Sequence, residues 1–332
     1  MTRFVSTTRS ARLLATLMLA VAATAAPPGA GAPHAAQPAL FVFRVGFWTN
    51  LHHQLHALTR PRPAAPLALP DGLPGAAREG WARALAHYRT LGRRSLLFDE
   101  GLIQLGTHLA ALSDDESPSA SAVTASTRTA LLDARPAYAA EWAAQQRAAR
   151  AFEARVAPLL GRHGAALARQ IAAAYGASWP GVPMSVDLVA DAGPPGNAYT
   201  LSQPARITVA VDDPRHQGMA ALEMLFHEAS HVWDVVLLDG LREAGRREGR
   251  VVRPDLWHGV LFFTAGELTR RELARAGLTY APYAEVQGMT AGVYRDVWSA
   301  IVEAWTPYLD GRRTMTDSLT ALVRAVGTLP PG

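Results

Sequence analysis

The chain has 332 residues, of which 49% are hydrophobic, and a formal net charge of +4. It contains no cysteine, and all of its basic residues are arginine. This composition excludes thiol nucleophiles, disulfides, thiolate zinc sites and chemistry that needs a Schiff-base or P-loop lysine. Any bound metal must therefore be held by His, Asp or Glu. No dense basic run with interleaved aromatic residues occurs, so nucleic acid is not an expected partner.

The N-terminal segment predicts export from the cell. Several arginines precede an apolar run at residues 13–25, which is followed by small residues and prolines. This order is typical of a signal peptide, and a run of about thirteen residues is shorter than the roughly twenty that a membrane-spanning helix needs. We predict a signal peptide at residues 1–26, a secreted or periplasmic protein, and no stable membrane span after cleavage.

The first half of the remaining chain is predicted to be mainly helical. Residues 27–40 are rich in Ala and Pro and read as a flexible segment. A strand or turn entering a helix is expected next, and apolar residues three and four positions apart then predict helices. These elements form an expected helical part at residues 41–178, with helices at 76–91, 96–112 and 131–175.

The second half, residues 179–332, is predicted to begin with a small sheet. Apolar and polar residues alternate, and a turn rich in Gly and Pro interrupts them, which indicates strands at 182–191, 199–201 and 207–211. The helical pattern resumes near Gln217, with breaks expected at Gly240, at 249–254, and near Pro282 and Pro307. The predicted fold class is α+β and predominantly helical, and residues 41–332 are compatible with a single domain.

The chemistry is concentrated in His227-Glu228-Ala229-Ser230-His231. Two histidines four positions apart lie one turn apart on one face of a helix, so both can bind a single ion. Glu228 follows the first histidine and can act as a general base toward a water at that ion. We predict Zn²⁺ as the cofactor, His227 and His231 as ligands and Glu228 as the catalytic base. The alternative is a core helix that carries two packed histidines and a surface glutamate.

The motif resembles that of the zincin metallopeptidases, and in particular their gluzincin branch, over residues 182–305. In that family a downstream helix supplies a glutamate as third ligand, and the resemblance implies Glu267 for this role. It also implies a zincin-like fold, a peptide or protein substrate and hydrolysis of peptide bonds. The alternative role for Glu267 is a surface carboxylate that pairs with Arg271. The peptidase interpretation depends on Glu267 facing the histidines.

Three other residues compete for the third position: His258, Glu243 and Asp234. The metzincin arrangement is excluded, because positions 234 and 237 hold Asp and Leu instead of Gly and His. Asp234 lies about 10 Å beyond His227 along a helix axis, so it is better suited to orienting an imidazole. His258 can be a ligand, a catalytic donor to the reacting oxyanion, or a packed histidine. Further candidate oxyanion donors are Tyr280, Tyr283 and Tyr294.

A short stretch before the motif is a candidate substrate-binding edge. Asn197, Ala198 and Tyr199 resemble the Asn-Ala-aromatic strand with which thermolysin-like gluzincins bind a peptide backbone. Physically, the free N–H and C=O groups of an edge strand can pair with an extended chain. Ordinary turn chemistry explains the Gly196-Asn197 pair equally well.

Two further patterns have open interpretations. His52 and His56 share the four-residue spacing, and a second metal site, a segment packed near the cleft and ordinary helix histidines are all compatible with it. The carboxylates at 99–100 and 114–116 permit acid–base chemistry of the glycosidase type, although solvated charge is the commoner role. The predicted function is a zinc metallopeptidase, and the alternative is a helical binding or structural protein, or an inactive zinc-binding homologue.

Overall fold

The structure is a computed structural model that describes residues 39–61, 69–193 and 196–329. The predicted signal peptide at 1–26 and nearly all of the predicted flexible segment at 27–40 lie outside these residues. Within the described part of the chain, no helix is both long and apolar enough to cross a membrane. The described residues after Pro38 form one compact unit.

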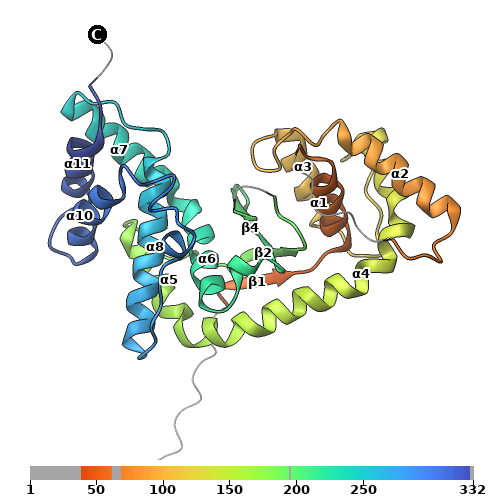
Figure 1. Cartoon of the computed structure of the whole chain (residues 1–332), viewed down its shortest axis with the longest axis horizontal. Helices are drawn as coiled ribbons and strands as arrows, with labels where there is room; N and C mark the ends of the chain where they lie inside the picture. The colour runs from red at the N-terminus through yellow and green to blue at the C-terminus, as the bar shows by residue number, and fades with distance from the viewer. Residues whose placement is uncertain (1–38, 62–68, 194–195, 330–332) are drawn as a thin grey trace, which may run out of the picture. The chain divides into compact units, whose positions relative to one another are not determined.

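A small mixed sheet of four strands lies at the centre of this unit (Figure 1). Its order is β1 (Phe41–Arg44), β2 (Met184–Val189), β4 (Ala205–Ala210) and β3 (Ala198–Ser202). The first three strands are parallel, whereas β3 runs antiparallel to β4 and forms one edge. Most side chains of β2 and β4 are buried, as the near-continuous apolar character of interior parallel strands leads one to expect. The predicted small sheet before the motif helix is thereby confirmed.

The helices between β1 and β2 build their own apolar core. They are α1 (Phe47–Thr59), α2 (Gly75–Arg89), α3 (Glu100–Leu109) and the long α4 (Ala125–Leu159), followed by a π-helical turn (Leu160–Gly164) and α5 (Ala165–Ala174). Trp48, Tyr88 and Tyr138 are among the fully buried side chains of this core. The predicted helical part is confirmed, but α4 begins eleven residues before Pro136 and runs through it. Thr124 caps α4, and Ala134, Ala137 and Tyr138 around Pro136 are fully buried, so packing maintains the helix there.

The chain after the sheet is helical, and its packing places the motif. A short 3-10 turn (Pro214–His216) leads to α6 (Met219–Ser230), and a second (His231–Trp233) leads to α7 (Asp234–Glu248). The remaining helices are α8 (Leu256–Arg275), α9 (Tyr283–Val286), α10 (Trp298–Leu309) and α11 (Met315–Val326). Helix α6 packs against α8 and the sheet (Figure 1), and they share one large hydrophobic core. The α+β, predominantly helical class is therefore confirmed.

One predicted break of this half, at Gly240, is wrong. Gly240 does not break the chain, because α7 runs through it, and a Cβ there would meet Leu319 Cδ1 at 2.4 Å. A glycine at this position lets α11 approach closely. The breaks predicted near Pro307 and at 249–254 are present. Pro307 lies in the last turn of α10, which ends at Leu309. Gly249 ends α7 in the left-handed conformation, with φ of 61°, which glycine adopts readily.

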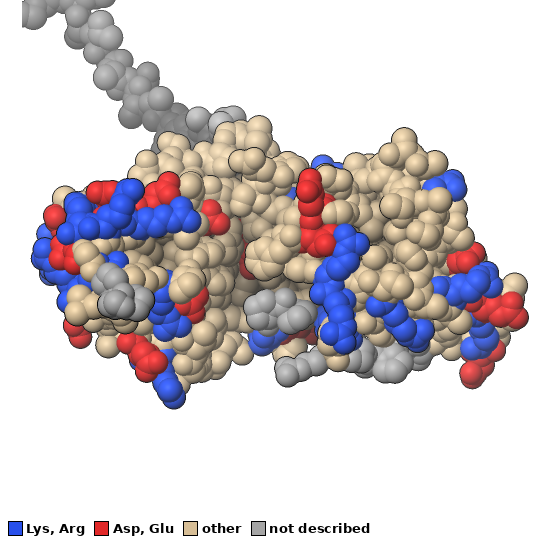
Figure 2. Space-filling model, turned by 90° about the horizontal axis from the view of Figure 1, so that it is seen from above, with Lys and Arg blue, Asp and Glu red and all other residues tan. Residues whose placement is uncertain are grey.

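The charged side chains on the surface are mixed in sign. On the face shown in Figure 2, arginines and acidic residues lie beside one another in several groups. Ion pairs on and near α7 are examples, since Arg246 pairs with Glu243 and Arg324 pairs with Glu248. Much of the arginine charge is therefore neutralised locally.

Candidate metal centre

Helix α6 holds the first part of the candidate site in a buried setting. Gly218 precedes it at a φ of 58°, and the apolar Leu222, Leu225 and Phe226 are fully buried. His227 and Glu228, on the last turns of the helix, are only 2% and 4% exposed. The α-helix ends at Ser230, and His231 begins a tighter 3-10 turn. The single long motif helix that the sequence predicts is therefore interrupted at its second histidine.

Three histidines meet where α6 and α8 pack together. One ring nitrogen from each of His227, His231 and His258 lies within 4.8 Å of the others. The Nε2 atoms of His227 and His258 are 3.3 Å apart. The two motif histidines come from consecutive turns, and His258 comes from the first turn of α8. These residues could hold a metal ion, and the structure itself contains none.

Burial keeps the three imidazoles neutral. It lowers the pKa of His227 well below its ordinary value, and the neighbouring histidines lower it further. For the same reasons the pKa of His231 is lowered to about 3. Burial lowers the pKa of His258 to about 4, although nearby Asp255 acts in the opposite direction. A neutral imidazole is the form that binds a metal, so the cluster is ready for a cation at neutral pH.

The spacing of His227 and His258 fits two ligands of one tetrahedral ion. Zinc–nitrogen bonds of about 2.0–2.1 Å place two ligand nitrogens roughly 3.3 Å apart at the tetrahedral angle. The observed separation of 3.3 Å between His227 and His258 Nε2 agrees with this value. Nδ1 of His227 is buried and has no hydrogen-bond partner among the described residues. Three histidines with a fourth position left for water or substrate form a common catalytic zinc arrangement.

Aromatic rings hold the histidines in place. Phe262, one turn after His258 on α8, stacks on the His227 ring with centroids 3.9 Å apart. Trp257 stacks on His258 at 5.0 Å and meets the His231 ring edge-on at 5.7 Å. Aromatic contacts of this kind stabilise a fixed ring orientation. The three imidazoles therefore sit in a packed apolar shell.

Glu228 is held by the edge strand of the sheet. Thr200 Oγ1, in β3, lies 2.8 Å from the carboxylate Oε2 of Glu228 and 2.8 Å from its backbone oxygen. Burial raises the pKa of Glu228 to about 7, against the lowering effect of the Thr200 hydrogen bond. A carboxyl group with a pKa near neutrality can both accept and return a proton at physiological pH.

Glu267, the predicted third ligand, does not reach the histidines, and this prediction is corrected. Its oxygens accept hydrogen bonds from Arg270 at 2.7 Å and Arg271 at 2.6 Å. Burial alone would raise the pKa of Glu267, but the two arginines lower it. Glu267 lies about nine residues after His258 on α8, which is two and a half turns and hence the opposite face. The alternative role as a carboxylate paired with Arg271 is the observed one.

The structure also shows where the other candidates for the third metal ligand lie. Glu243 is exposed and pairs with Arg246 and Arg247 on α7. Asp234 opens α7 and is not part of the histidine cluster. His258, for which ligand, oxyanion donor and packing roles were all open, lies among the candidate ligands.

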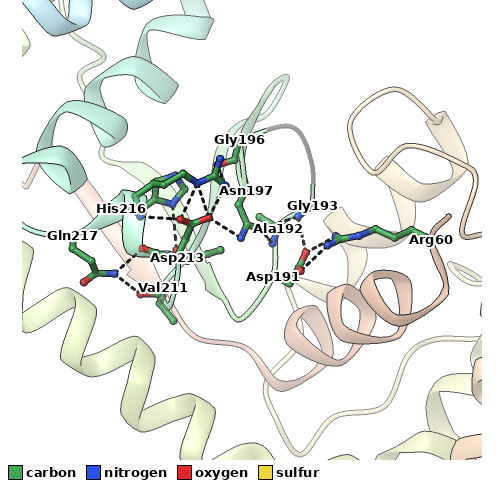
Figure 3. Close-up of polar contacts among 12 residues, drawn as sticks. Arg60, Asp191, Ala192, Gly193, Gly196, Asn197, Val211, Asp213, His216 and Gln217 are labelled. Carbon is green, nitrogen blue, oxygen red and sulfur yellow. Dashed lines mark hydrogen bonds and ion pairs between the residues drawn. The ribbon is translucent and has the colours of Figure 1, made fainter. Parts of the chain in front are cut away.

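The candidate substrate strand divides into a turn and a strand. Asn197 adopts a positive φ of 59°, and its Oδ1 accepts hydrogen bonds from the backbone N–H groups of Ala192 and Gly193 (Figure 3). Its Nδ2 donates to Asp213 at 3.1 Å. Asn197 therefore serves the turn, which is the alternative that turn chemistry offered.

Ala198 and Tyr199 open the edge strand β3, as the candidate role requires. The Tyr199 hydroxyl is 3.0 Å from Nε2 of His53 in α1. Its side chain is therefore directed to the helical part of the protein. The contribution that β3 can make to ligand binding comes from its backbone and from Thr200.

The histidines of α1 and the acidic pairs have structural partners. His52 Nδ1 lies 2.9 Å from the Tyr88 hydroxyl, and His56 Nε2 lies 2.9 Å from the backbone oxygen of Arg94. They do not belong to the metal-compatible cluster found among the described residues. The contacts of His52 and His56 therefore favour their interpretation as ordinary packed helix histidines.

The acidic residues at 99–100 and 114–116 include two with structural roles. Asp99 caps α3, and Asp114 accepts hydrogen bonds from Phe47 N and Trp142 Nε1.

Glu223, one turn before His227 on α6, is a further buried residue of the site that the motif pattern did not indicate. This carboxylate is 1% exposed, and its Oε2 accepts hydrogen bonds from the Tyr280 hydroxyl at 2.6 Å and the Tyr283 backbone N–H at 2.9 Å. Tyr283 in turn stacks parallel to Phe262, with centroids 6.1 Å apart. Glu223 thus fastens the segment before α9 over the site. Its position on the buried face of the α6 pattern was the available signal.

The buried carboxyl of Glu223 should make the stability of the protein depend on pH. Burial raises its pKa from 4.5 to about 7, so the folded protein binds this proton more tightly than the unfolded chain. The protonated Glu223 carboxyl stabilises the folded protein fully below the pKa of this group in the unfolded chain. This stabilisation is lost as the pH rises through about 7, its pKa in the folded protein. In metal-free protein, we expect the free energy of unfolding of wild type relative to Glu223→Gln to fall by about 2–3 kcal/mol from about pH 5 to about pH 8.

Urea denaturation at several pH values measures this difference. The buried histidines are common to both proteins, so their titration cancels in the comparison. Glu79→Gln, at an exposed position of α2, is the matched control and should show no such trend. A difference between wild type and Glu223→Gln that stays constant with pH would contradict the role of this carboxyl.

Comparison with known proteins gave no relative: no family model, curated protein or solved structure matches this chain.

Proposed function

We propose that the protein is a zinc-dependent hydrolase that cleaves peptide bonds. The observation that carries the proposal is the convergence of His227, His231 and His258, with Glu228 next to His227 on α6. This arrangement unites three neutral metal donors and a carboxyl whose pKa is about 7. Zinc is proposed because three histidines with an open position suit it.

The metal and the protein contribute different parts of this chemistry. Bound zinc would supply a Lewis acid and would lower the pKa of water to near neutrality. Glu228 accepts a proton from the attacking water and transfers it to the leaving amine. The imidazoles of His227, His231 and His258 would hold the ion, and the rings of Phe262 and Trp257 fix the orientation of those imidazoles.

Tyr283 is the proposed donor for the oxyanion, because it stacks on Phe262, which itself stacks on His227. Burial raises the pKa of the Tyr283 hydroxyl above its ordinary value. Arg215 acts in the opposite direction, and the carboxylates of Asp213, Glu223 and Glu228 raise the pKa further. The hydroxyl is therefore protonated at neutral pH and able to donate. Tyr280 is instead engaged with Glu223.

The substrate class is inferred from the edge strand. In the described part of the chain, β4 is the only strand that pairs with β3, so the other edge of β3 presents backbone N–H and C=O groups. An extended peptide can add to such an edge by backbone hydrogen bonds. Because Thr200 in β3 contacts Glu228, a peptide bound along β3 would pass near the proposed base. This support replaces the gluzincin ligand pattern, which Glu267 does not fulfil.

Export remains part of the proposal through the sequence of residues 1–26, which has the pattern of a signal peptide. Because the chain contains no cysteine, the proposed site would hold its metal through histidine.

Metal analysis and a peptide assay test the proposal. Protein purified without an affinity tag or added metal should contain about one zinc per chain, and it should cleave members of a mixed peptide library. Removal of zinc with a chelator should abolish cleavage, and readdition should restore it. A protein that holds no zinc would instead be the helical binding or structural protein of the alternative. A zinc-loaded protein that cleaves no peptide would retain the metal site but refute the peptidase.

A further inference from the structure

The contact between β3 and α6 assigns a second role to the sheet besides the binding of a peptide. Thr200 lies in the middle of β3 and is 7% exposed. Its hydroxyl oxygen is 2.8 Å from two atoms of the same residue, the backbone oxygen and the carboxylate Oε2 of Glu228. We propose that Thr200 is a positioning residue that fixes the carboxylate of the general base, an inference that rests on the proposed function.

The hydroxyl joins the backbone and the side chain of Glu228. A free glutamate side chain has three rotatable bonds and loses much rotamer freedom when it is held. Because one hydroxyl contacts both the carboxylate and the backbone oxygen of Glu228, the carboxylate is held close to its own backbone and these rotations are restricted. Because only Oε2 meets Thr200, the other carboxylate oxygen, Oε1, is left to take the water's proton. Thr200 therefore orients the base without occupying the oxygen that would react.

The position of the Thr200 hydroxyl is itself fixed by the sheet. Thr200 pairs with Ile207 of β4 in the antiparallel register, and Ile207 is fully buried. The preceding residue, Tyr199, is fastened through its hydroxyl to His53 of α1. A site supported by regular elements is held more accurately than one supported by loops. The hydroxyl thus reaches α6 from a rigid strand.

Thr200 contacts the motif close to the place where its helix changes from an α-helix to a 3-10 turn. The α-helix gives way to a 3-10 turn at His231, so the backbone tightens between Glu228 and the second histidine. The Glu228 backbone oxygen that Thr200 contacts is also within this last turn. Thr200 therefore supports the segment in which a base and a ligand are only three positions apart.

The test compares three substitutions at this position with a matched control. Thr200→Val keeps the β-branched shape and removes the hydroxyl, Thr200→Ala also removes the second branch, and Thr200→Ser restores the hydroxyl. Thr208→Val is the control, because Thr208 is a buried threonine of β4 that pairs with Tyr199. Each variant is loaded with zinc, and its metal content, unfolding midpoint, kcat and KM are measured on a peptide cleaved by wild type.

We expect Thr200→Val and Thr200→Ala to bind one zinc and to lose kcat by about ten- to a hundredfold, the effect usual for groups that orient metal-site residues. KM should change little, because the hydroxyl is not part of the peptide-binding edge. Thr200→Ser should recover most of the lost kcat, and Thr208→Val should retain wild-type kcat. Either hydroxyl-free variant is sufficient for the test, so a folding defect in one does not prevent it.

A spectroscopic measurement provides a readout that is independent of turnover. The visible spectrum of the cobalt-loaded protein responds to the geometry at the ion and to the water beside Glu228. Thr200→Val should shift it in the same direction as Glu228→Gln, whereas Thr208→Val should not. Wild-type kcat together with a wild-type cobalt spectrum in folded Thr200→Val or Thr200→Ala would overturn the assignment. A wild-type protein without zinc or peptidase activity would refute the proposed function, and the role of Thr200 would be refuted with it.

Discussion

Zinc-loaded Glu228→Gln is expected to lose peptide hydrolysis by about a hundred- to ten-thousandfold, the range typical of a general acid–base residue. The substitution keeps the size of the side chain and its ability to accept the Thr200 hydrogen bond, but an amide cannot take up the water's proton. Zinc content should be unchanged, because Glu228 is not among the three candidate ligands. Metal analysis and peptide cleavage on the same sample therefore separate loss of the base from loss of the ion.

A glutamate far from the histidines provides the control for Glu228→Gln. Glu243→Gln removes a carboxylate from the exposed surface of α7, where Glu243 pairs with arginines, and it should leave both zinc and activity intact. If zinc-loaded Glu228→Gln cleaved peptides at the wild-type rate, Glu228 would not be the base. In that event the raised pKa of Glu228, about 7, would reflect burial alone and would have no catalytic meaning.

Local patterns allowed part of the site to be predicted from the sequence. The four-residue spacing of His227 and His231 indicated a shared face, and both lie in the metal-compatible cluster. Alternating residues predicted strands at 182–191, 199–201 and 207–211, and strands β2, β3 and β4 occur there. These features depend on the period of a helix or strand, which a single segment of sequence contains.

The third ligand could not be chosen in that way, because it depends on how α8 packs against α6. Glu267 was favoured by family resemblance, but its pairing with Arg270 and Arg271 was visible in the three- and four-residue spacing. The helical period also separates His258 from Glu267, since positions about nine residues apart face opposite sides. The aromatic Phe262, one turn after His258, was the signal that marked the buried face.

Tertiary contacts also determined where the helices end. Gly240 is a poor helix former, but α7 continues through it because the close approach of Leu319 requires a residue without a side chain. Conversely, nothing in the sequence pattern marked the 3-10 turn at His231–Trp233, where the helix tightens. Such positions are decided by the partner elements, which the local sequence does not specify.

The assignment of His258 as the third ligand leads to the second large effect. His258→Ala should weaken zinc binding by more than about a hundredfold, since even residues that only orient a ligand cost ten- to a hundredfold in affinity. The imidazoles of His227, on α6, and His231, in the 3-10 turn after it, would remain, and they do not form a closed site. Glu267→Ala, on the opposite face of α8, should bind zinc as wild type does. Competition with a chromophoric zinc chelator measures both affinities.

Thermal unfolding distinguishes loss of a ligand from general damage to α8. Zinc that binds only the folded protein raises its unfolding temperature, so the addition of zinc should stabilise wild type and Glu267→Ala but not His258→Ala. Loss of the Glu267 ion pairs with Arg270 and the partly buried Arg271 should lower the unfolding temperature of Glu267→Ala without changing the shift that zinc produces. The opposite pattern, with zinc affinity lost in Glu267→Ala and kept in His258→Ala, would restore the gluzincin ligand set and contradict the three-histidine centre. Equal loss in both variants would show that α8 as a whole, and not His258 in particular, supports the ion.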